Sequence, residues 1–391
     1  MKATIPVGQM LYEFKEKLGD NTEPEVLTLT ERNGFVAQST KFKKRLAVTD
    51  TKSYKVIRRG DIAFNPYLLW AGAVAHNTDW ETGLISPLYP TFRVREGYDS
   101  TFVSRLLLTG NMIERYDTIA FGSIPRKRRS SVQDFLALEI PEPPSLRQQR
   151  RIAAILDSVD ELRAQRRQFI AHLDALTQSI FRSMFGDPAT NSAHLPLVSL
   201  GSIGRWQSGG TPLRSVDSFF EGDIPWYTSG ELDRKYLAQT KEMITEDAVS
   251  QSSAKFFPAG ALLLGMYDTA ALKSGISTTR GTCNQAIAFG LLDPNLAQND
   301  YVYECIQIAK DHYRRLRRGV RQKNLNLSMI RDIEIPLPPL ERQQGFSTRM
   351  AAVEQMREVG LAQLAKLDSL FASLQSAAFT GTLSQRDDDY S

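Results

Sequence analysis

Two long stretches of the chain carry apolar residues at alternating spacings of three and four, the pattern of a helix with one apolar seam. They cover about residues 145–185 and 340–380, and no proline interrupts either. Each predicts a helix of about 40 residues, or about 60 Å at 1.5 Å per residue. We expect the helices to pack together through their seams. The predicted seam residues are Ile152, Ile155, Val159, Leu162, Phe169, Leu173, Leu176 and Ile180, and then Val353, Met356, Leu367, Leu370 and Leu374.

A repeated decapeptide precedes each predicted helix. It reads I-P-E-P-P-S-L-R-Q-Q from Ile140 to Gln149 and I-P-L-P-P-L-E-R-Q-Q from Ile335 to Gln344, with seven of ten positions identical. The copies lie 195 residues apart and the seams 194 apart, so we expect one residue to have been lost after the decapeptide. Its prolines remove amide donors and exclude a helix or a central strand, which predicts a stiff segment before each helix. The chain therefore reads as a duplication with internal pseudo-two-fold symmetry.

One position interrupts the seam of the first helix. Arg166 stands there, and Gly360 stands at the corresponding position of the second helix. Both lie near the midpoints of their helices, which a two-fold axis would bring together. We hypothesise that Arg166 crosses the helix pair over Gly360, whose missing side chain leaves room. A separation of more than one helix diameter would contradict this.

Short β-prone runs broken by glycine and proline precede each helix. Residues 54–64 and 255–264 both predict strand, glycine turn and strand, at an offset of 200, and residues 101–115 and 299–316 each predict a helix. The expected fold class is α/β (α+β), with two globular domains separated by two long coiled-coil helices. The expected boundaries are 1–139 for the first domain, 140–187 for the proline hinge and first helix, 188–334 for the second domain, and 335–391 for the second hinge, second helix and short tail.

The composition, with 42% hydrophobic and 24% charged residues, is that of a soluble globular protein. Its two cysteines, Cys283 and Cys305, have no C-x-x-C spacing, so we expect neither a disulfide framework nor a metal knuckle. No apolar run is long enough to span a membrane. The expected location is the reducing cytoplasm.

Positive charge is concentrated in two windows, although the net charge is only +4. Residues 126–129 read R-K-R-R, and residues 310–323 contain seven basic residues and one acid. The windows carry +4 and +6, which leaves −6 for the rest of the chain. One such run is usually a solvated face. Two runs in corresponding places of a duplicated chain indicate contact with a DNA backbone, held with strong salt dependence and no sequence preference.

Polar loops in the second half are candidates for reading DNA sequence. Residues 208–212, 226–230 and 284–285 offer backbone amides, aromatic edges and carboxamides, which contact phosphates and adenine. Turn chemistry is the alternative for each loop, and for Gly209 and Gly210 the two interpretations have equal weight. The predicted DNA-binding residues are Arg126, Lys127, Arg128, Arg129, Gly209, Gly210, Thr211, Tyr227, Ser229, Asn284, Gln285, Arg314, Arg315, Arg317, Arg318, Arg321 and Lys323.

The sequence lacks the motifs of cofactor chemistry. It has no Gly-Lys dipeptide for a Walker A loop and no G-x-G-x-x-G, and its four histidines are too dispersed to indicate a metal site. Asn65-Pro66-Tyr67 is similar to the D/N-P-P-Y/F loop of amino-methyltransferases but lacks the second proline, so we interpret it as a turn at a strand end. We expect no catalytic residue, metal or cofactor in this chain.

Taken together, these motifs resemble the specificity subunit of a type I restriction-modification enzyme. The first half departs from the family, because no S-G-G-T-P occurs before Leu138, and is similar to a second type of target-recognition domain through residues 60–65 and 83–87. The second half carries the resemblance through motifs that stand in the family's order: S-G-G-T-P at 208–212, G-D-I-P-W at 222–226, N-Q at 284–285, I-P-L-P-P at 335–339 and R-Q-Q at 342–344.

The resemblance implies two target-recognition domains held apart by two antiparallel helices. Each domain would read one half of a split double-stranded DNA site through the major groove. Two methyltransferase (modification) subunits would dock around the helices, methylate adenine N6 and bring adenosylmethionine, and motor-nuclease (restriction) subunits would bring ATP and magnesium. This chain would be a non-catalytic subunit. Because the scaffold repeats and the presumed reading loops differ, we expect an asymmetric target.

Two other classes of function remain as alternatives. A stand-alone DNA methyltransferase or nuclease would act on DNA without partners, which the missing cofactor loops disfavour. A coiled-coil adaptor without a DNA role predicts that charge reversal at residues 126–129 and 314–318 leaves DNA affinity unchanged.

Overall fold

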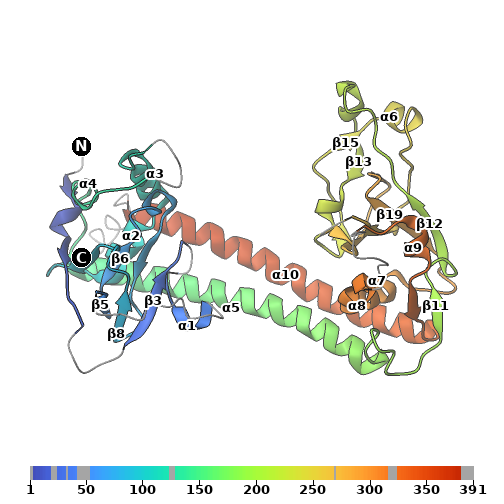
Figure 1. The fold of residues 1–391 in the computed structure, drawn as a ribbon, viewed down its shortest axis with the longest axis horizontal. Helices are drawn as coiled ribbons and strands as arrows, with labels where there is room; N and C mark the ends of the chain where they lie inside the picture. Colours follow the sequence, from blue (N-terminus) through green and yellow to red (C-terminus); the bar gives the residue numbers. More distant parts are fainter. Residues whose placement is uncertain are drawn as a thin grey trace, which may run out of the picture. The chain divides into compact units, whose positions relative to one another are not determined.

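The computed structural model describes residues 3–18, 24–31, 34–41, 53–122, 128–267, 270–315 and 324–379. The chain divides into two compact units, residues 1–166 with 363–391 and residues 167–362. Each unit contains one sheet-rich domain and a part of both long helices (Figure 1). The division therefore cuts through both helices, whereas the expected boundaries follow the order of the chain.

In the described part of the first unit, two four-stranded sheets carry the domain, and a two-stranded sheet pairs β1 with β10. One four-stranded sheet is antiparallel, with the order β2-β9-β6-β7, and the other is mixed, with the order β4-β3-β8-β5. The core includes Phe64, Phe92 and Phe135, whose ring centroids lie between 4.8 and 5.6 Å apart. The strands are β1 (Thr4–Pro6), β2 (Leu11–Phe14), β3 (Glu25–Leu29), β4 (Phe35–Ala37), β5 (Lys55–Arg58), β6 (Ile62–Phe64), β7 (Val74–His76), β8 (Thr82–Ile85), β9 (Thr91–Val94) and β10 (Glu139–Pro141), and the helices are η1 (Val7–Gln9), α1 (Gln38–Lys41), η2 (Leu69–Ala71), α2 (Ser100–Leu107), α3 (Gly110–Thr118) and α4 (Val132–Leu136).

Within the described residues of the second unit, a larger sheet has the order β12-β19-β16-β17-β14 and a smaller one the order β15-β13-β18. Both long helices reach its core, where Phe181 lies 5.4 Å from Tyr301 and 5.5 Å from Phe346 between ring centroids. The strands are β11 (Leu197–Ser199), β12 (Gly204–Ser208), β13 (Ile224–Tyr227), β14 (Tyr236–Leu237), β15 (Met243–Ile244), β16 (Leu262–Gly265), β17 (Ser274–Ser277), β18 (Thr282–Cys283), β19 (Ile287–Leu292) and β20 (Glu334–Pro336), and the helices are η4 (Asp217–Phe220), η5 (Ser229–Glu231), α6 (Glu246–Ser250), α7 (Asn299–Ile308), α8 (Lys310–Arg315) and α9 (Leu327–Arg331).

The helix predicted before each basic window is broken into two. In the first unit, α2 ends at Leu107 and the Thr109 hydroxyl caps α3 by accepting a hydrogen bond from the Met112 amide at 3.3 Å. In the second unit, α7 ends at Ile308 and α8 begins at Lys310. The single helices expected over 101–115 and 299–316 were therefore wrong. In the first unit the local cap by Thr109 competes with helical periodicity.

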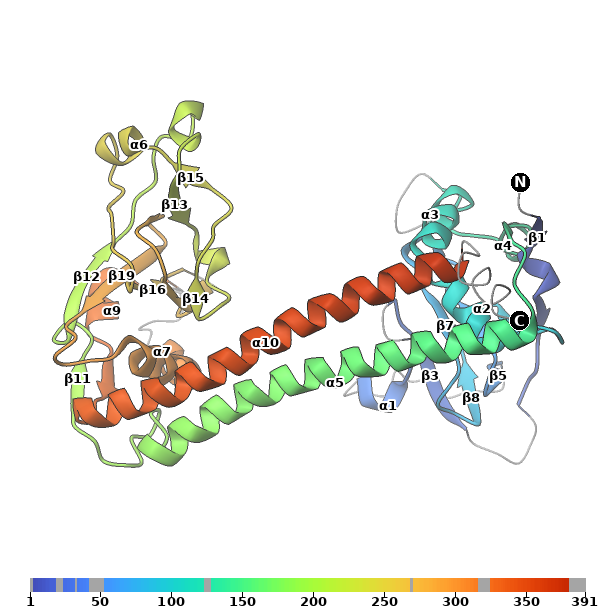
Figure 2. The ribbon, with the colours of Figure 1, turned by 180° about the vertical axis from the view of Figure 1, so that it is seen from behind.

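The two predicted long helices are confirmed as α5 (Leu146–Phe185) and α10 (Leu340–Phe379). α5 ends just before Gly186, whose φ of 76° lies in the left-handed region that favours glycine. Within each unit the helices run antiparallel, because the early part of one packs beside the late part of the other (Figure 2).

The buried face of α5 departs from the predicted seam at every second position. Ile152, Val159 and Leu173 are buried as predicted. At the alternate positions the buried residue is the one that follows the predicted residue. Leu156, for example, is 1% exposed, whereas the predicted Ile155 is 36% exposed. Ile155, Leu162, Phe169 and Leu176 are all at least 36% exposed.

The same difference occurs in α10. Val353 is buried and Leu367 and Leu374 are half-buried, whereas Met356 and Leu370 are 43% and 45% exposed. The cause is polar residues inside the seam. The arginines at 163 and 357 lie in the buried seam because each forms an ion pair with the other helix. A prediction from apolar residues alone passes over these positions and places the seam one residue away, on a more exposed face.

Gly360 lies where the helices approach closely within the second unit. A Cβ at this position would be 3.2 Å from Ile170 Cγ1 and 3.5 Å from Phe169 Cδ1. The glycine therefore leaves room for residues that follow Arg166. Arg166 itself is half-buried and falls in the first unit, and its crossing over Gly360 stays a prediction.

Each proline decapeptide begins as an edge strand and ends as the first turn of a long helix. Ile140 pairs with Ile5, and Ile335 pairs with Val198. The strands correspond at an offset of 195, whereas the helices begin at Leu146 and Leu340, an offset of 194. The expected loss of one residue therefore falls inside the decapeptide and not after it.

Of the two predicted strand-turn-strand units, the one over 54–64 forms β5, a turn at Gly60 and β6, whereas in 255–264 only the second strand, β16, forms. A β-hairpin that begins with this second strand is repeated in the two domains at the same offset of 200. It joins β6 to β7 in the first domain and β16 to β17 in the second. The Gly60 amide donates to the Asn77 carbonyl at 2.8 Å, and the Gly260 amide donates to the Ser277 carbonyl at 2.8 Å. Both glycines have positive φ, 90° and 85°. The duplication therefore extends from the helices into the sheets.

Candidate nucleic-acid interface

The S-G-G-T-P loop leaves β12 and crosses tightly over neighbouring backbone. The Gly209 amide donates to the Ile287 carbonyl at 3.0 Å, and the Gly210 amide donates to the Cys283 carbonyl at 2.9 Å. A Cβ on either glycine would overlap backbone atoms of Cys283 or Ser253. Both amides are used within the protein, so the geometry favours close packing over phosphate binding as the reason for these glycines.

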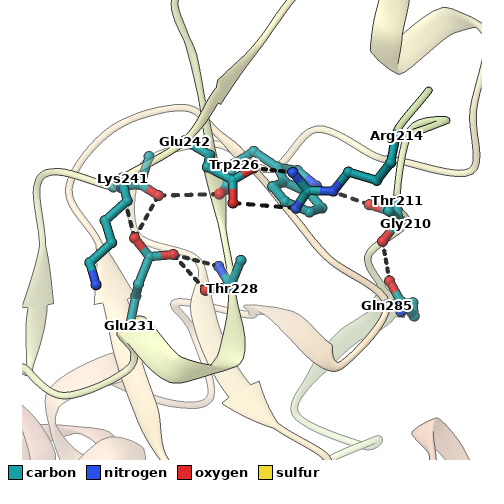
Figure 3. Close-up of polar contacts among 10 residues, drawn as sticks. Gly210, Thr211, Arg214, Trp226, Thr228, Glu231, Lys241, Glu242 and Gln285 are labelled. Atoms are coloured by element: carbon teal, nitrogen blue, oxygen red, sulfur yellow. Dashed lines mark hydrogen bonds and ion pairs between the residues drawn. The ribbon is translucent and has the colours of Figure 1, made fainter. Parts of the chain in front are cut away.

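The end of this loop is tied to the N-Q segment. The Thr211 hydroxyl donates to the Gln285 side-chain oxygen (Figure 3). Gln285 is exposed, and its neighbour Asn284 is half-buried, with its side-chain oxygen accepting the Ala286 amide at 3.1 Å. The structure thus brings Thr211 and Gln285 together at an accessible edge, and it uses the Asn284 carboxamide oxygen for a local turn.

An arginine that the sequence did not single out lies beside this loop. The Arg214 guanidinium is 4.5 Å from the Phe220 ring centroid and 4.7 Å from that of Trp226, and it pairs with Glu242 (Figure 3). The buried Trp226 indole donates to the Gly210 carbonyl at 3.0 Å. The stacked guanidinium therefore joins the S-G-G-T-P loop to the strand that carries Trp226.

A partly buried carboxylate holds the W-Y-T-S-G loop. Glu231 accepts hydrogen bonds from the Thr228 amide and hydroxyl at 2.8 Å each, from the Lys241 amide at 2.8 Å and from the Thr240 hydroxyl at 2.9 Å (Figure 3). Burial by itself would raise the pKa of Glu231, but these hydrogen bonds outweigh it and hold the pKa below its usual range. The ionised carboxylate fixes two loops, and a capping box at Thr228 was the signal that could have revealed it.

The other two residues predicted in this loop have different surroundings. Tyr227 is completely buried, and its hydroxyl donates to the Leu237 carbonyl at 3.2 Å. Because the Tyr227 side chain has no exposed surface, it packs beneath the loop in the protein interior and does not form the loop's accessible face. Ser229 is half-buried at the start of η5.

The first basic window is partly described. The Arg128 guanidinium pairs with Asp117 at 2.5 Å and donates to that residue's carbonyl at 2.7 Å, so this arginine ties the window to α3. Arg129 exchanges two backbone hydrogen bonds of 3.0 Å with Phe121, which is 57% exposed. The predicted residues Arg126 and Lys127 lie outside the described residues.

The second basic window is also partly described. Arg314 donates from Nε to the Ala271 carbonyl at 3.0 Å, whereas Arg315 is exposed at the end of α8. Each window therefore contains one arginine with a structural partner next to one that faces solvent or an aromatic ring. The predicted residues Arg317, Arg318, Arg321 and Lys323 lie outside the described residues.

The described part of the chain holds no group of three or more His, Cys, Asp or Glu side chains placed to bind a metal ion. Cys283 and Cys305 are free and buried, and burial raises the pKa of the Cys305 thiol to about 12. Among the described helices none is both long and apolar enough to cross a membrane.

Comparison with known families finds a match in the second half of the chain. Residues 197–363 match the family described as "Type I restriction modification DNA specificity domain". The EcoR124I/EcoR124II specificity subunit of Escherichia coli is 28% identical over 152 residues, 37% of this chain and 37% of that protein. The MjaIX specificity subunit of Methanocaldococcus jannaschii is 27% identical over 165 residues, 40% of this chain and 37% of that protein. The match thus spans just over a third of the length of these relatives.

Solved structures extend the similarity to the whole fold. The S subunit of a type I restriction-modification system from M. genitalium aligns with a TM-score of 0.62 and 15% identity, covering 96% of both chains. A structure reported for complex assembly and conformational transition of the type I R-M system aligns with a TM-score of 0.57 and 17% identity, covering 96% of this chain and 97% of that one. The predicted mixed α/β fold, with two sheet-rich domains and a long helix pair, is confirmed.

Proposed function

We propose that this chain, whose resemblance to type I specificity subunits the comparisons confirm, is the DNA specificity subunit of a type I restriction-modification complex. Each of its two domains would read one half of a bipartite double-stranded DNA site. The chain would carry no chemistry of its own, and catalysis would reside in partner subunits.

The observation that carries this proposal is a repeated scaffold with divergent loops. Gln149 and Gln343 are buried and make the same bonds. Each accepts an amide at 2.9 Å from the residue before α2 or α7, Asp99 or Gln298, and each donates to a proline carbonyl at 2.8 Å. The S-G-G-T-P loop, by contrast, occurs only in the second domain. Different loops on equivalent scaffolds are suited to two different half-sites, so the whole target would be asymmetric.

The partners follow from the family. Two methyltransferase subunits would dock around the helices and domains and bring adenosylmethionine, and restriction subunits would bring ATP and magnesium. The helices would set the distance between half-sites. A helix of 40 residues is about 60 Å long, which is ample for half-sites about one DNA turn, or 34–36 Å, apart.

The decisive experiment maps methylated adenines in a host without adenine methylation of its own. The chain is expressed with type I methyltransferase subunits, with these subunits alone, and by itself. We expect methylation only in the first case, at a split motif whose halves differ. Methylation by the chain alone would identify it as a stand-alone enzyme. Absence of both methylation and sequence-specific DNA binding in the complex would favour the adaptor function.

A further inference from the structure

The tips of the two equivalent β-hairpins each present an exposed tyrosine. Tyr67 lies between β6 and β7 and is 39% exposed, and Tyr267 lies 200 residues later between β16 and β17 and is 38% exposed. In the first tip, the Asn65 side-chain oxygen accepts the Tyr67 amide at 3.0 Å. This bond confirms the turn interpretation of Asn65-Pro66-Tyr67 and leaves the ring at the surface.

Each hairpin tip also receives the chain as it returns from a basic window. The Ser130 amide donates to the Pro66 carbonyl at 2.9 Å, and the Leu325 amide donates to the Met266 carbonyl at 2.7 Å. The two acceptors are 200 residues apart, like the tyrosines that follow them. The same juxtaposition of hairpin tip and basic window is therefore built twice, although the tip and the window are far apart in sequence.

In the first domain, arginines and aromatic rings alternate on this surface. The Arg129 guanidinium lies 5.8 Å from the Tyr67 ring centroid, and the Arg128 guanidinium lies 5.8 Å from that of Trp70. The Trp70 indole donates to the Tyr67 carbonyl at 2.9 Å, which holds the two rings in one turn. Such a surface combines positive charge with flat faces that can pack against sugars and base edges.

In the second domain, the window begins over the same hairpin. The hydrogen bond from Arg314 to the Ala271 carbonyl attaches α8 to the segment between β16 and β17. This leaves the next residue, Arg315, exposed. Charge complementarity favours DNA as the occupant of both surfaces, because the two windows carry +4 and +6 in a chain whose remainder is negative.

We propose that Tyr67 and Tyr267 are equivalent DNA-contacting residues, one for each half-site, and that Arg129 and Arg315 hold the phosphate backbone beside them. The proposal rests on the proposed function, and it names residues that decide specificity within it. The tyrosine hydroxyl can donate or accept a hydrogen bond at a base edge, whereas the arginines position the duplex without reading it.

The test uses the full chain in complex with its methyltransferase subunits and DNA duplexes that carry the mapped site or a site with one scrambled half. We expect Tyr67→Ala to weaken binding to the intact site about tenfold, the loss typical of one base pair's contacts. This variant should no longer distinguish the intact site from a site scrambled in one half, but should still distinguish it from a site scrambled in the other half. Tyr267→Ala should lose discrimination in the other half. Tyr67→Gln and Tyr267→Gln, which keep a polar side chain of intermediate size, serve if an alanine variant does not fold.

Matched controls are available in each domain. Tyr12 is 37% exposed and lies under the Arg95 guanidinium at 5.2 Å, so Tyr12→Ala removes the same type of side chain elsewhere on the first unit. Leu296, 45% exposed, gives the control for the second unit. If the wild-type complex discriminates between the duplexes and the tyrosine variants bind them as the control variants do, the inference is overturned and the proposed function still stands. A wild-type complex without sequence discrimination would refute the proposed function itself.

Discussion

Arg163 on α5 donates from Nε to Asp368 on α10, with the two atoms 2.6 Å apart. The reciprocal pair, Arg357 of α10 with Asp174 of α5, occurs in the other unit. Both members correspond at an offset of 194, so one ion pair is made twice with the helices exchanged. Such reciprocity is the mark of a two-fold relation between equivalent surfaces.

We expect Arg163→Ala to lower the free energy of unfolding by about 1 kcal/mol, the upper range for partly exposed ion pairs. The guanidinium also lies 4.5 Å from the Phe371 ring centroid, which adds to the loss. Chemical denaturation of Arg163→Ala, Asp368→Ala and the double variant gives the coupling directly. Arg182→Ala, at an exposed position of the same helix, is the control and should change little. Additive effects of the two substitutions would show that the pair does not stabilise the helices.

The buried glutamine of each decapeptide should matter more than its neighbour. Gln149→Leu and Gln343→Leu leave the amides of Asp99 and Gln298, the N-cap residues of α2 and α7, without their acceptors. We expect a loss of about 2–3 kcal/mol from unsatisfied buried groups. The controls are the other glutamine of each copy, half-buried Gln148 and exposed Gln344. Thermal unfolding of the four variants tests the structural alignment, which pairs Gln149 with Gln343. Equal effects of Gln148 and Gln343 would instead support the alignment by sequence motif.

Acid should weaken the second domain through Glu231. Its pKa in the folded protein lies below the usual 4.5. The ionised carboxylate's contribution is therefore fully present above pH 4.5 and is lost as the pH falls toward the folded-state pKa. Glu231→Gln should lower stability at neutral pH and flatten the decline below pH 4.5, measured by denaturation across pH. Glu221→Gln, at an exposed position, should leave the profile unchanged. An unaltered acid profile in Glu231→Gln would mean that other groups cause the decline.

The exposed Arg315 of the second window and the paired Arg128 of the first should behave differently. Arg315→Ala should reduce the slope of log affinity for DNA against log salt by about 0.9, the loss of one phosphate contact, with no change in stability. Arg128→Ala should instead destabilise the first unit, because it removes the pair with Asp117. Binding titrations over a salt series, together with thermal unfolding, separate these effects. A salt slope that Arg315→Ala leaves unchanged would exclude this arginine from the DNA contact.

If the helices set the spacing of the half-sites, one extra heptad in both should lengthen it. Seven residues preserve the seam and add about 10.5 Å, which corresponds to about three base pairs at 3.4 Å each. Insertions after Arg167 and Leu361 lie at equivalent positions. Mapping of methylated adenines should then find the same half-sites separated by about three more base pairs. An insertion in one helix alone is the control and should disrupt the pair. Unchanged spacing with both insertions would show that the helices do not set the distance between the half-sites.

The sequence by itself determined the duplication, the approximate bounds of both long helices, the strand-turn-strand unit of the first domain and the resemblance to specificity subunits. These features are local: proline and glycine restrict the backbone where they stand, and an apolar period of three and four residues needs no knowledge of the partner. The turns at Gly60 and Gly260 were predictable for this reason.

Only the tertiary structure decided which stripe of each helix is buried, which glutamines are equivalent, and that each hairpin tip lies against a basic window. Arg163 is a seam residue because Asp368 neutralises it from the other helix. The Ser130 amide donates to the Pro66 carbonyl, although the two residues are far apart in the sequence. These outcomes depend on contacts between residues far apart in the chain. Local periodicity contains no information about such contacts.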